Sequence, residues 1–189
     1  MKMKCFILAV SLAGTFTLSA SELKDDFENV TKSKSGTDIP YGWIYYEHFN
    51  KDGGSLESTE DAKSGKHAMH VKSFDMIDEI FVFNATSIDT NPGDKLEVSF
   101  SIKGKGIIKP GLYLYNQKQV YIGTFPGEEM KIDSEKWIDQ KIILTVPAEK
   151  YNDFDVNKVR ILLTLERNTD IFIDDLIVKT QNKEMEKKQ

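Results

Sequence analysis

The sequence of 189 residues contains one cysteine, Cys5, close to its start. A single cysteine cannot form a disulfide within the chain, so the small disulfide-stapled scaffolds common among exported proteins are excluded. The fold must therefore be held by a hydrophobic core, with or without a bound metal. The chain is long enough for one domain with a full core and too short for two domains of ordinary size.

Long hydrophobic runs are absent after the first 20 residues. Lys2 and Lys4 precede a short apolar stretch that ends before Ser19-Ala20-Ser21, which is typical of a secretory signal peptide. A membrane-spanning helix needs roughly 20 apolar residues, and no later stretch qualifies. Cys5 has no small-residue cleavage box before it, so we expect no lipid anchor. We expect residues 1–20 to be a removed leader and the protein to be secreted, either extracellular or periplasmic.

Clusters of basic residues are also absent. The 25 Lys and Arg residues are mixed with 30 Asp and Glu residues, and the formal net charge is −5. Loss of Lys2 and Lys4 with the leader would make it −7. Binding to DNA or RNA needs clustered Lys and Arg to displace the counterions of the phosphates. Nucleic acid is therefore excluded as an expected partner.

The motifs of common enzyme classes are missing as well. The sequence has no Gly-x-Ser-x-Gly elbow, no His-Glu-x-x-His and no phosphate loop. His67 and His70 are an odd number of residues apart, so a strand would send them to opposite faces, and His48 is isolated. The acids show no same-face cluster on one strand of the kind that jelly-roll glycosidases use. We expect a protein without catalytic activity.

Period-two alternation of apolar and polar residues runs through most of the chain, whereas sustained helical periodicity is missing. The clearest case follows the turn Asn91-Pro92-Gly93-Asp94, where every second residue from Leu96 to Ile102 is apolar. One face of this strand would meet the core and the other would meet water. Gly104 and Gly106 are expected to end it, and a second strand is expected from 107 to 115.

The fold class follows from these strands and from the Gly, Pro and Asn turns between them. The other expected strands are 43–49, 67–74, 80–88, 120–122, 138–146, 159–166 and 171–179, with short pieces near Phe27 and Leu56. About eleven strands at this spacing predict an all-β, two-sheet antiparallel β-sandwich of the jelly-roll type. Residues 21–180 would form this domain, with one helical turn at 148–154. The Lys- and Glu-rich residues 181–189 would be a flexible tail.

Six short motifs occur in an order and spacing that match a known family. They are Asp26-Phe27-Glu28, Gly42-Trp43, Ser64-Gly65-Lys66-His67-Ala68-Met69, Pro92-Gly93-Asp94-Lys95 before Val98-Ser99-Phe100, Trp137, and Phe172-Ile173-Asp174-Asp175-Leu176. Over residues 23–179 the chain resembles the carbohydrate-binding modules of the bacterial cellulase C type. The resemblance implies a galactose-binding-like jelly roll, a structural calcium ion and, in many members, a polysaccharide-binding cleft.

The resemblance also implies the calcium ligands: the side chains of Glu28 and Asp174 and the backbone carbonyl of Lys66. A calcium ion takes six to eight oxygens, so carboxylates and carbonyls suit it. Asp26 and Asp175 fall on the opposite faces of their strands unless a bulge intervenes. The alternative is that these acids are separate, solvated charges at strand ends.

Sugars are bound by flat aromatic faces and by amide or charged side chains that reach their hydroxyl groups. Tyr113 and Tyr115 share one face of a strand if Leu112 and Leu114 face the core. Amide residues follow directly, and another tyrosine lies across the next turn. The predicted polysaccharide-binding surface comprises Tyr113, Tyr115, Asn116, Gln117, Gln119 and Tyr121.

Other interpretations of these aromatic and charged residues stay open. The tyrosines could form a cross-strand ladder, because tyrosine favours strands. In the family pattern Trp43 and Trp137 more often pack structurally. Arg160 and Glu166 share a strand face, where they could line a polar floor or form an ordinary exposed ion pair.

Two functional hypotheses follow. The first is a non-catalytic module that binds a polysaccharide or a cell-wall glycan. The second is a structural or adhesion domain of the same fold without a sugar site, because a fold does not fix a function. In either case we expect a monomer.

Overall fold

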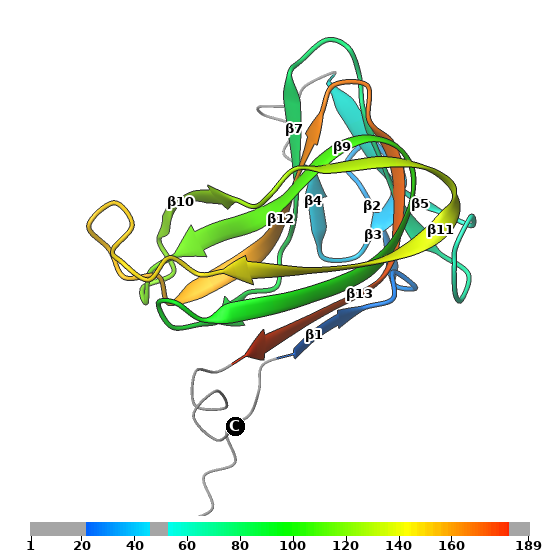
Figure 1. Ribbon diagram of the computed structural model, residues 1–189. Coiled ribbons are helices and arrows are strands. Elements are labelled where there is room, and N and C mark those ends of the chain that lie inside the picture. Colours follow the sequence, from blue (N-terminus) through cyan, green and yellow to red (C-terminus); the bar gives the residue numbers. More distant parts are fainter. Residues whose placement is uncertain (1–21, 46–52, 182–189) are drawn as a thin grey trace, which may run out of the picture.

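The computed structural model describes residues 22–45 and 53–181. These residues form an all-β domain without a helix, so the predicted fold class is confirmed (Figure 1). Because no helix is present in the described ranges, none is available there to cross a membrane. The expected leader, nearly all of the expected tail, and His48 lie outside these ranges.

Eleven strands make one sheet, and β2 and β3 pair as a small second sheet. The strands are β1 Glu22–Asp25, β2 Val30–Lys32, β3 Asp38–Pro40, β4 Trp43–Tyr45, β5 Gly54–Thr59, β6 Ala68–Ser73, β7 Glu79–Asn84, β8 Ile88–Asp89, β9 Lys95–Tyr115, β10 Tyr121–Pro126, β11 Met130–Thr145, β12 Lys158–Glu166 and β13 Asp170–Gln181. The expected helical turn at 148–154 is wrong. Tyr151 and Phe154 form a β-bridge there, and the two residues between them have positive φ angles.

Strand β9 is the longest element, with 21 residues, and it runs through both layers of the sandwich (Figure 1). One edge pairs first with β13 and then with β12, and the other edge pairs first with β11 and then with β10. The expectation that Gly104 and Gly106 end the strand is therefore wrong. We call β1, β5, β6, β11, β13 and residues 95–106 of β9 half-sheet A, and β4, β7, β8, β10, β12 and residues 107–115 half-sheet B.

The two glycines bend β9 without breaking it. Their φ angles are +118° and +138°, which side chains with a Cβ rarely adopt. A Cβ on Gly104 would overlap the backbone oxygen of Asp170, and one on Gly106 would overlap Thr169. The hydroxyl of Thr169, which is buried, accepts the N–H of Ile107 and donates to its carbonyl. The turn between β12 and β13 thus fits directly against the bend.

The hydrophobic core lies between the two half-sheets. Half-sheet A contributes alternate residues such as Val98 and Ile173, and half-sheet B contributes Leu112, Leu114 and Ile161. Each of these five side chains is at most 1% exposed. Burial of apolar surface contributes about 25 cal/mol of stability per Å². A core of this size can therefore stabilise the fold without disulfides.

The first and last strands of the described domain lie side by side. β1 pairs antiparallel with β13, with Asp25 opposite Leu176. The carboxylate of Asp25 accepts the indole N–H of Trp43 at 2.8 Å and the N–H of Phe27 at 3.0 Å. Burial raises the pKa of Asp25 in spite of these hydrogen bonds. The beginning of the domain is therefore tied to both half-sheets.

We predict that Gly104→Ala lowers the free energy of unfolding by about 3 kcal/mol or more, because it adds strain at a positive φ to a clash with backbone. Gly36→Ala is the matched control, since Gly36 also has a positive φ but no atom within 4 Å of an added Cβ. It should cost only about 1–2 kcal/mol. Urea unfolding of both variants measures the difference, and equal losses would mean that the bend is not sterically locked.

Candidate functional site

The predicted tyrosines lie on the outer face of half-sheet B. Leu112 and Leu114 are fully buried in the core, so the alternation of β9 directs Tyr113 and Tyr115 to the opposite side. Tyr121, on β10, is opposite Tyr115 in the register and is 50% exposed. Its ring centroid lies 5.2 Å from that of Tyr113 and 6.0 Å from that of Tyr115. The predicted juxtaposition of these three rings is confirmed, and their role in binding stays a prediction.

Two further side chains complete this surface, which we call the tyrosine face: Phe83, Tyr113, Tyr115, Tyr121 and Arg160. The ring of Phe83, on β7, is 4.6 Å from that of Tyr113. The guanidinium carbon of Arg160, on β12, lies 4.8 Å from the centroid of the Tyr115 ring, an arrangement that favours a cation–π interaction. The tyrosine face thus draws on four neighbouring strands.

The centre of half-sheet B is apolar on both sides. Phe83 and Leu162, which pair in the register, are 7% and 1% exposed although they project away from the core cluster. Sequence reasoning missed Phe83. A signal was present, because β7 reads Ile80-Phe81-Val82-Phe83, a continuous apolar run that indicates burial on both faces rather than on one.

Farther along the same face, Lys109 joins two acids. Its Nζ lies 2.9 Å from Glu79 and 2.7 Å from Glu166. Hydrogen bonds to Glu166 and Glu79 raise the pKa of Lys109. The exposed ion pair considered for Arg160 and Glu166 is therefore wrong, because Glu166 pairs with Lys109 and the Nε of Arg160 donates to Ser87 at 3.2 Å.

The turn between β9 and β10 carries the predicted amide residues. The side-chain oxygen of Asn116 accepts the N–H of Lys118 at 2.9 Å and that of Val120 at 3.0 Å, so this residue holds the turn. Gln119 has a φ of +60°, and both it and Gln117 are exposed. The structure places all three beside the tyrosine face, and their contact with a sugar stays a prediction.

The side chains of Glu28 and Asp174, two of the predicted calcium ligands, both accept hydrogen bonds from residues 63–67, which include Lys66 and which we call the clasp loop. Glu28 Oε1 accepts the N–H of Lys66 at 2.6 Å and that of His67 at 2.9 Å. Asp174 Oδ2 accepts the N–H of Lys63 at 2.9 Å and that of Ser64 at 3.0 Å. Acids from opposite ends of the domain therefore bind the same short segment.

The two carboxylates that bond to the clasp loop, those of Glu28 and Asp174, differ in environment. Hydrogen bonds from the N–H groups of His67 and Lys66 lower the pKa of Glu28, which lies at the surface. Asp174 is fully buried, and this burial raises its pKa in spite of the N–H groups of Ser64, Asp175 and Lys63 that point at it.

The shape of the clasp loop suits a carboxylate that reaches inward. Gly65 has a φ of +64°, and a Cβ there would occupy the place of the Glu28 carboxylate. A bulge in β13 follows Asp174, and Asp175 has a positive φ. No three His, Cys, Asp or Glu side chains converge on a metal position in the described ranges, so a cation here would also need backbone oxygens such as that of Lys66. Carboxylate and carbonyl oxygens are the donor types that a hard cation takes.

The two tryptophans lie away from the tyrosine face. Trp43 is 2% exposed and belongs to the core. Trp137 lies on the outer face of half-sheet A, where Lys103 Nζ is 5.0 Å from its ring centroid and 4.9 Å from that of Phe172. His70 stacks on the other face of Phe172 at 4.1 Å. His70 and Phe172 thus stack face to face, and Lys103 lies over the rings of both Phe172 and Trp137, which is typical of a structural cross-strand ladder.

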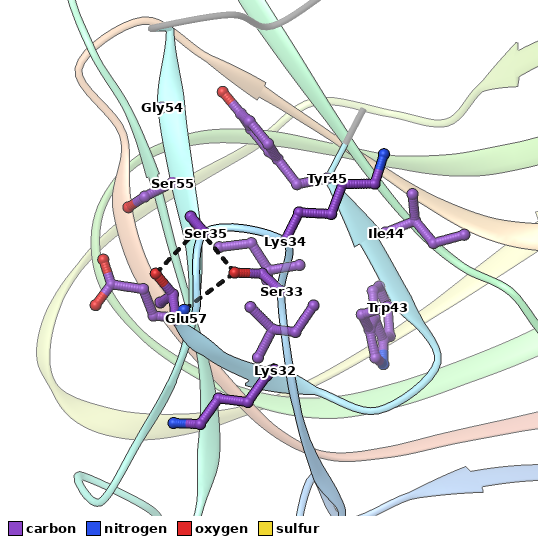
Figure 2. Close-up of a pocket in the computed structure, with 13 residues that line it drawn as sticks. Lys32, Ser33, Lys34, Ser35, Trp43, Ile44, Tyr45, Gly54, Ser55 and Glu57 are labelled. Carbon is purple, nitrogen blue, oxygen red and sulfur yellow. Dashed lines mark hydrogen bonds between the residues drawn. The ribbon is translucent and has the colours of Figure 1, made fainter. Parts of the chain in front are cut away.

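A hollow lies beside the β2–β3 hairpin, away from the tyrosine face (Figure 2). Lys32, Lys34, Tyr45 and Glu57 line it together with the hydroxyls of the hairpin turn. Its lining is mostly hydroxyl, lysine and backbone groups, and it contains one tyrosine, Tyr45, whereas the tyrosine face brings three tyrosine rings together.

Comparison with known proteins identifies the architecture. No family model matches the sequence, and no curated protein matches it. Solved structures do match. The CBM22-1 xylan-binding domain of Paenibacillus barcinonensis Xyn10C has a TM-score of 0.54 at 11% identity, covering 84% of this chain and 92% of that domain.

Two other similar structures belong to larger proteins. The arabinose-bound α-L-arabinofuranosidase MgGH51 has a TM-score of 0.58 at 12% identity, covering 84% of this chain and 26% of that one. The enzymatically active domain of bacteriophage CBA120 tailspike protein 4 has a TM-score of 0.55 at 10% identity, covering 75% of this chain and 20% of that one. At such identities the likeness shows the fold, and the chain has the jelly-roll fold of carbohydrate-binding modules.

Proposed function

We propose that this protein is a secreted, non-catalytic carbohydrate-binding module that binds a polysaccharide or a cell-wall glycan through the tyrosine face. The observation that carries the proposal is the gathering of Tyr113, Tyr115 and Tyr121 with Arg160 on one outer face. Aromatic rings contact the apolar faces of pyranoses, and the phenol and guanidinium groups bond sugar hydroxyls. The exposed amides of Gln117 and Gln119 would extend this surface.

The fold supports the proposal without deciding it. The similar domain from Paenibacillus barcinonensis is described as xylan-binding, and the match covers 92% of that domain and 84% of this chain. The spacing of the sequence motifs favours the cellulase C type within this fold. The contacts among the tyrosine rings also suit the second hypothesis, a structural or adhesion domain in which the rings only stabilise the sheet.

We predict that Tyr115→Ala weakens glycan binding about tenfold or more, because an aromatic contact contributes roughly 0.5–1.5 kcal/mol and the variant also releases Arg160. Affinity electrophoresis in native gels that contain single polysaccharides measures the effect. Tyr41→Ala is the control, because Tyr41 is 69% exposed and lies outside the tyrosine face. If no polysaccharide retards the wild-type protein, the structural or adhesion role replaces this proposal.

We further propose that the clasp loop holds a structural calcium ion through the carboxylates of Glu28 and Asp174 and the carbonyl of Lys66. The cation would neutralise the buried charge of Asp174, whose pKa is raised by burial. Its role would be to stabilise the joined ends of the domain. Sugar binding would depend on it only through the fold.

We predict that calcium raises the melting temperature by several degrees over a chelated sample, because a ligand at 100 times its Kd adds about 2.7 kcal/mol of stability. Glu28→Gln should fold, since Glu28 lies at the surface, and should lose most of the calcium response. Thermal melts with chelator, calcium and magnesium measure this. An identical melting temperature in chelator and in millimolar calcium would refute the calcium proposal and leave the proposal for glycans intact.

A further inference from the structure

The cations on the outer face of half-sheet B differ in how they are paired. Strands β9 and β12 place Lys109, Lys158 and Arg160 on this face. Lys109 lies between two glutamates, and Lys158 forms an ion pair with Asp89 at 2.5 Å. Arg160 contacts the Ser87 hydroxyl and the Tyr115 ring, and no carboxylate in residues 22–45 or 53–181 pairs with it.

Arg160 is held in an orientation that suits recognition of an anion. The Tyr115 ring contacts the guanidinium on one side, with 4.8 Å between the guanidinium carbon and the ring centroid, and the Ser87 hydroxyl accepts the N–H of Nε. The remaining N–H groups form a planar fork that matches the two oxygens of a carboxylate. Because the ring and the hydroxyl already order the side chain, less conformational entropy is lost when an anion binds.

We propose that the glycan bound by the tyrosine face carries carboxylates, as a polymer of uronic acids does, and that Arg160 binds one of them. This inference rests on the proposed function and names its substrate class. The tyrosines contact the sugar rings, and the guanidinium binds the acid group of a ring beside Tyr115. A neutral sugar would leave this oriented cation without a counter-charge.

Because the protein has a negative net charge, any preference for an anionic glycan must come from a local contact with a cation. The chain is formally −5, so its long-range field repels a polyanion and gives no general attraction to one. A carboxylate is attracted where a cation lacks an acidic partner. Among Lys109, Lys158 and Arg160, the cations that β9 and β12 place on the outer face of half-sheet B, Arg160 is the one that pairs with no carboxylate in the described residues.

The experiment compares one polymer in two forms, polygalacturonate and the same polymer with its carboxyl groups reduced to alcohols, by calorimetry at fixed ionic strength. The wild-type protein should bind the acidic form about tenfold or more tightly than the reduced form. Arg160→Gln should remove this preference and bind both forms about equally. Lys158→Gln is the matched control. Lys158 lies two residues before Arg160 on β12 and carries the same charge, but it is already paired with Asp89. Lys158→Gln should retain the preference.

Several results would overturn the inference. Equal wild-type affinity for the two forms, or binding to neutral polymers only, would refute the specificity for carboxylates while the proposed glycan binding stands. Equal losses in Arg160→Gln and Lys158→Gln would show a general charge effect instead of a site. If other uronic acid polymers and neutral glycans also fail to bind the folded protein, the proposed function fails, and the inference fails with it.

Discussion

The bend of β9 at Gly104 and Gly106 is the constraint on which the rest of the structure depends. It allows one strand to serve both half-sheets, so that core residues from each meet across the sandwich. Thr169 locks the bend by bonding the backbone of Ile107. Past this point the alternation of β9 continues without interruption, and it is this continuity that brings Leu112 into the core and Tyr113 to the outer face.

The parts of the fold that depend on local alternation could be predicted from the sequence. β6, β12 and β13 lie within one or two residues of their expected ends, and Tyr113, Tyr115 and Tyr121 meet as expected. A glycine in a strand pattern, such as Gly104, usually indicates the end of the strand. Whether Gly104 ends β9 or only bends it depends on the residues that pack against it, and these lie more than 60 positions farther along the chain.

In the candidate site, too, local alternation could be predicted from the sequence, whereas contacts between distant strands could not. Phe83 and Arg160 lie on separate strands, and only the pairing of β7, β12 and β9 brings them to the tyrosines. From the sequence, Glu166 was a possible ion-pair partner of Arg160, whereas in the sheet Glu166 forms its ion pair with Lys109 on β9. Charge pairing across a sheet is set by register and not by spacing along one strand. That Arg160 pairs with no carboxylate in residues 22–45 and 53–181 is therefore visible only in the three-dimensional structure.

The central claim is that the outer face of half-sheet B is a glycan-binding surface built by the bend in β9. A titration of the ¹⁵N-labelled protein with uronic acid oligosaccharides, followed by backbone amide shifts, tests it most directly. The account predicts saturable shifts that cluster at Phe83, residues 113–121 and Arg160. Shifts that cluster instead around Phe172 and Trp137 on the outer face of half-sheet A would contradict it.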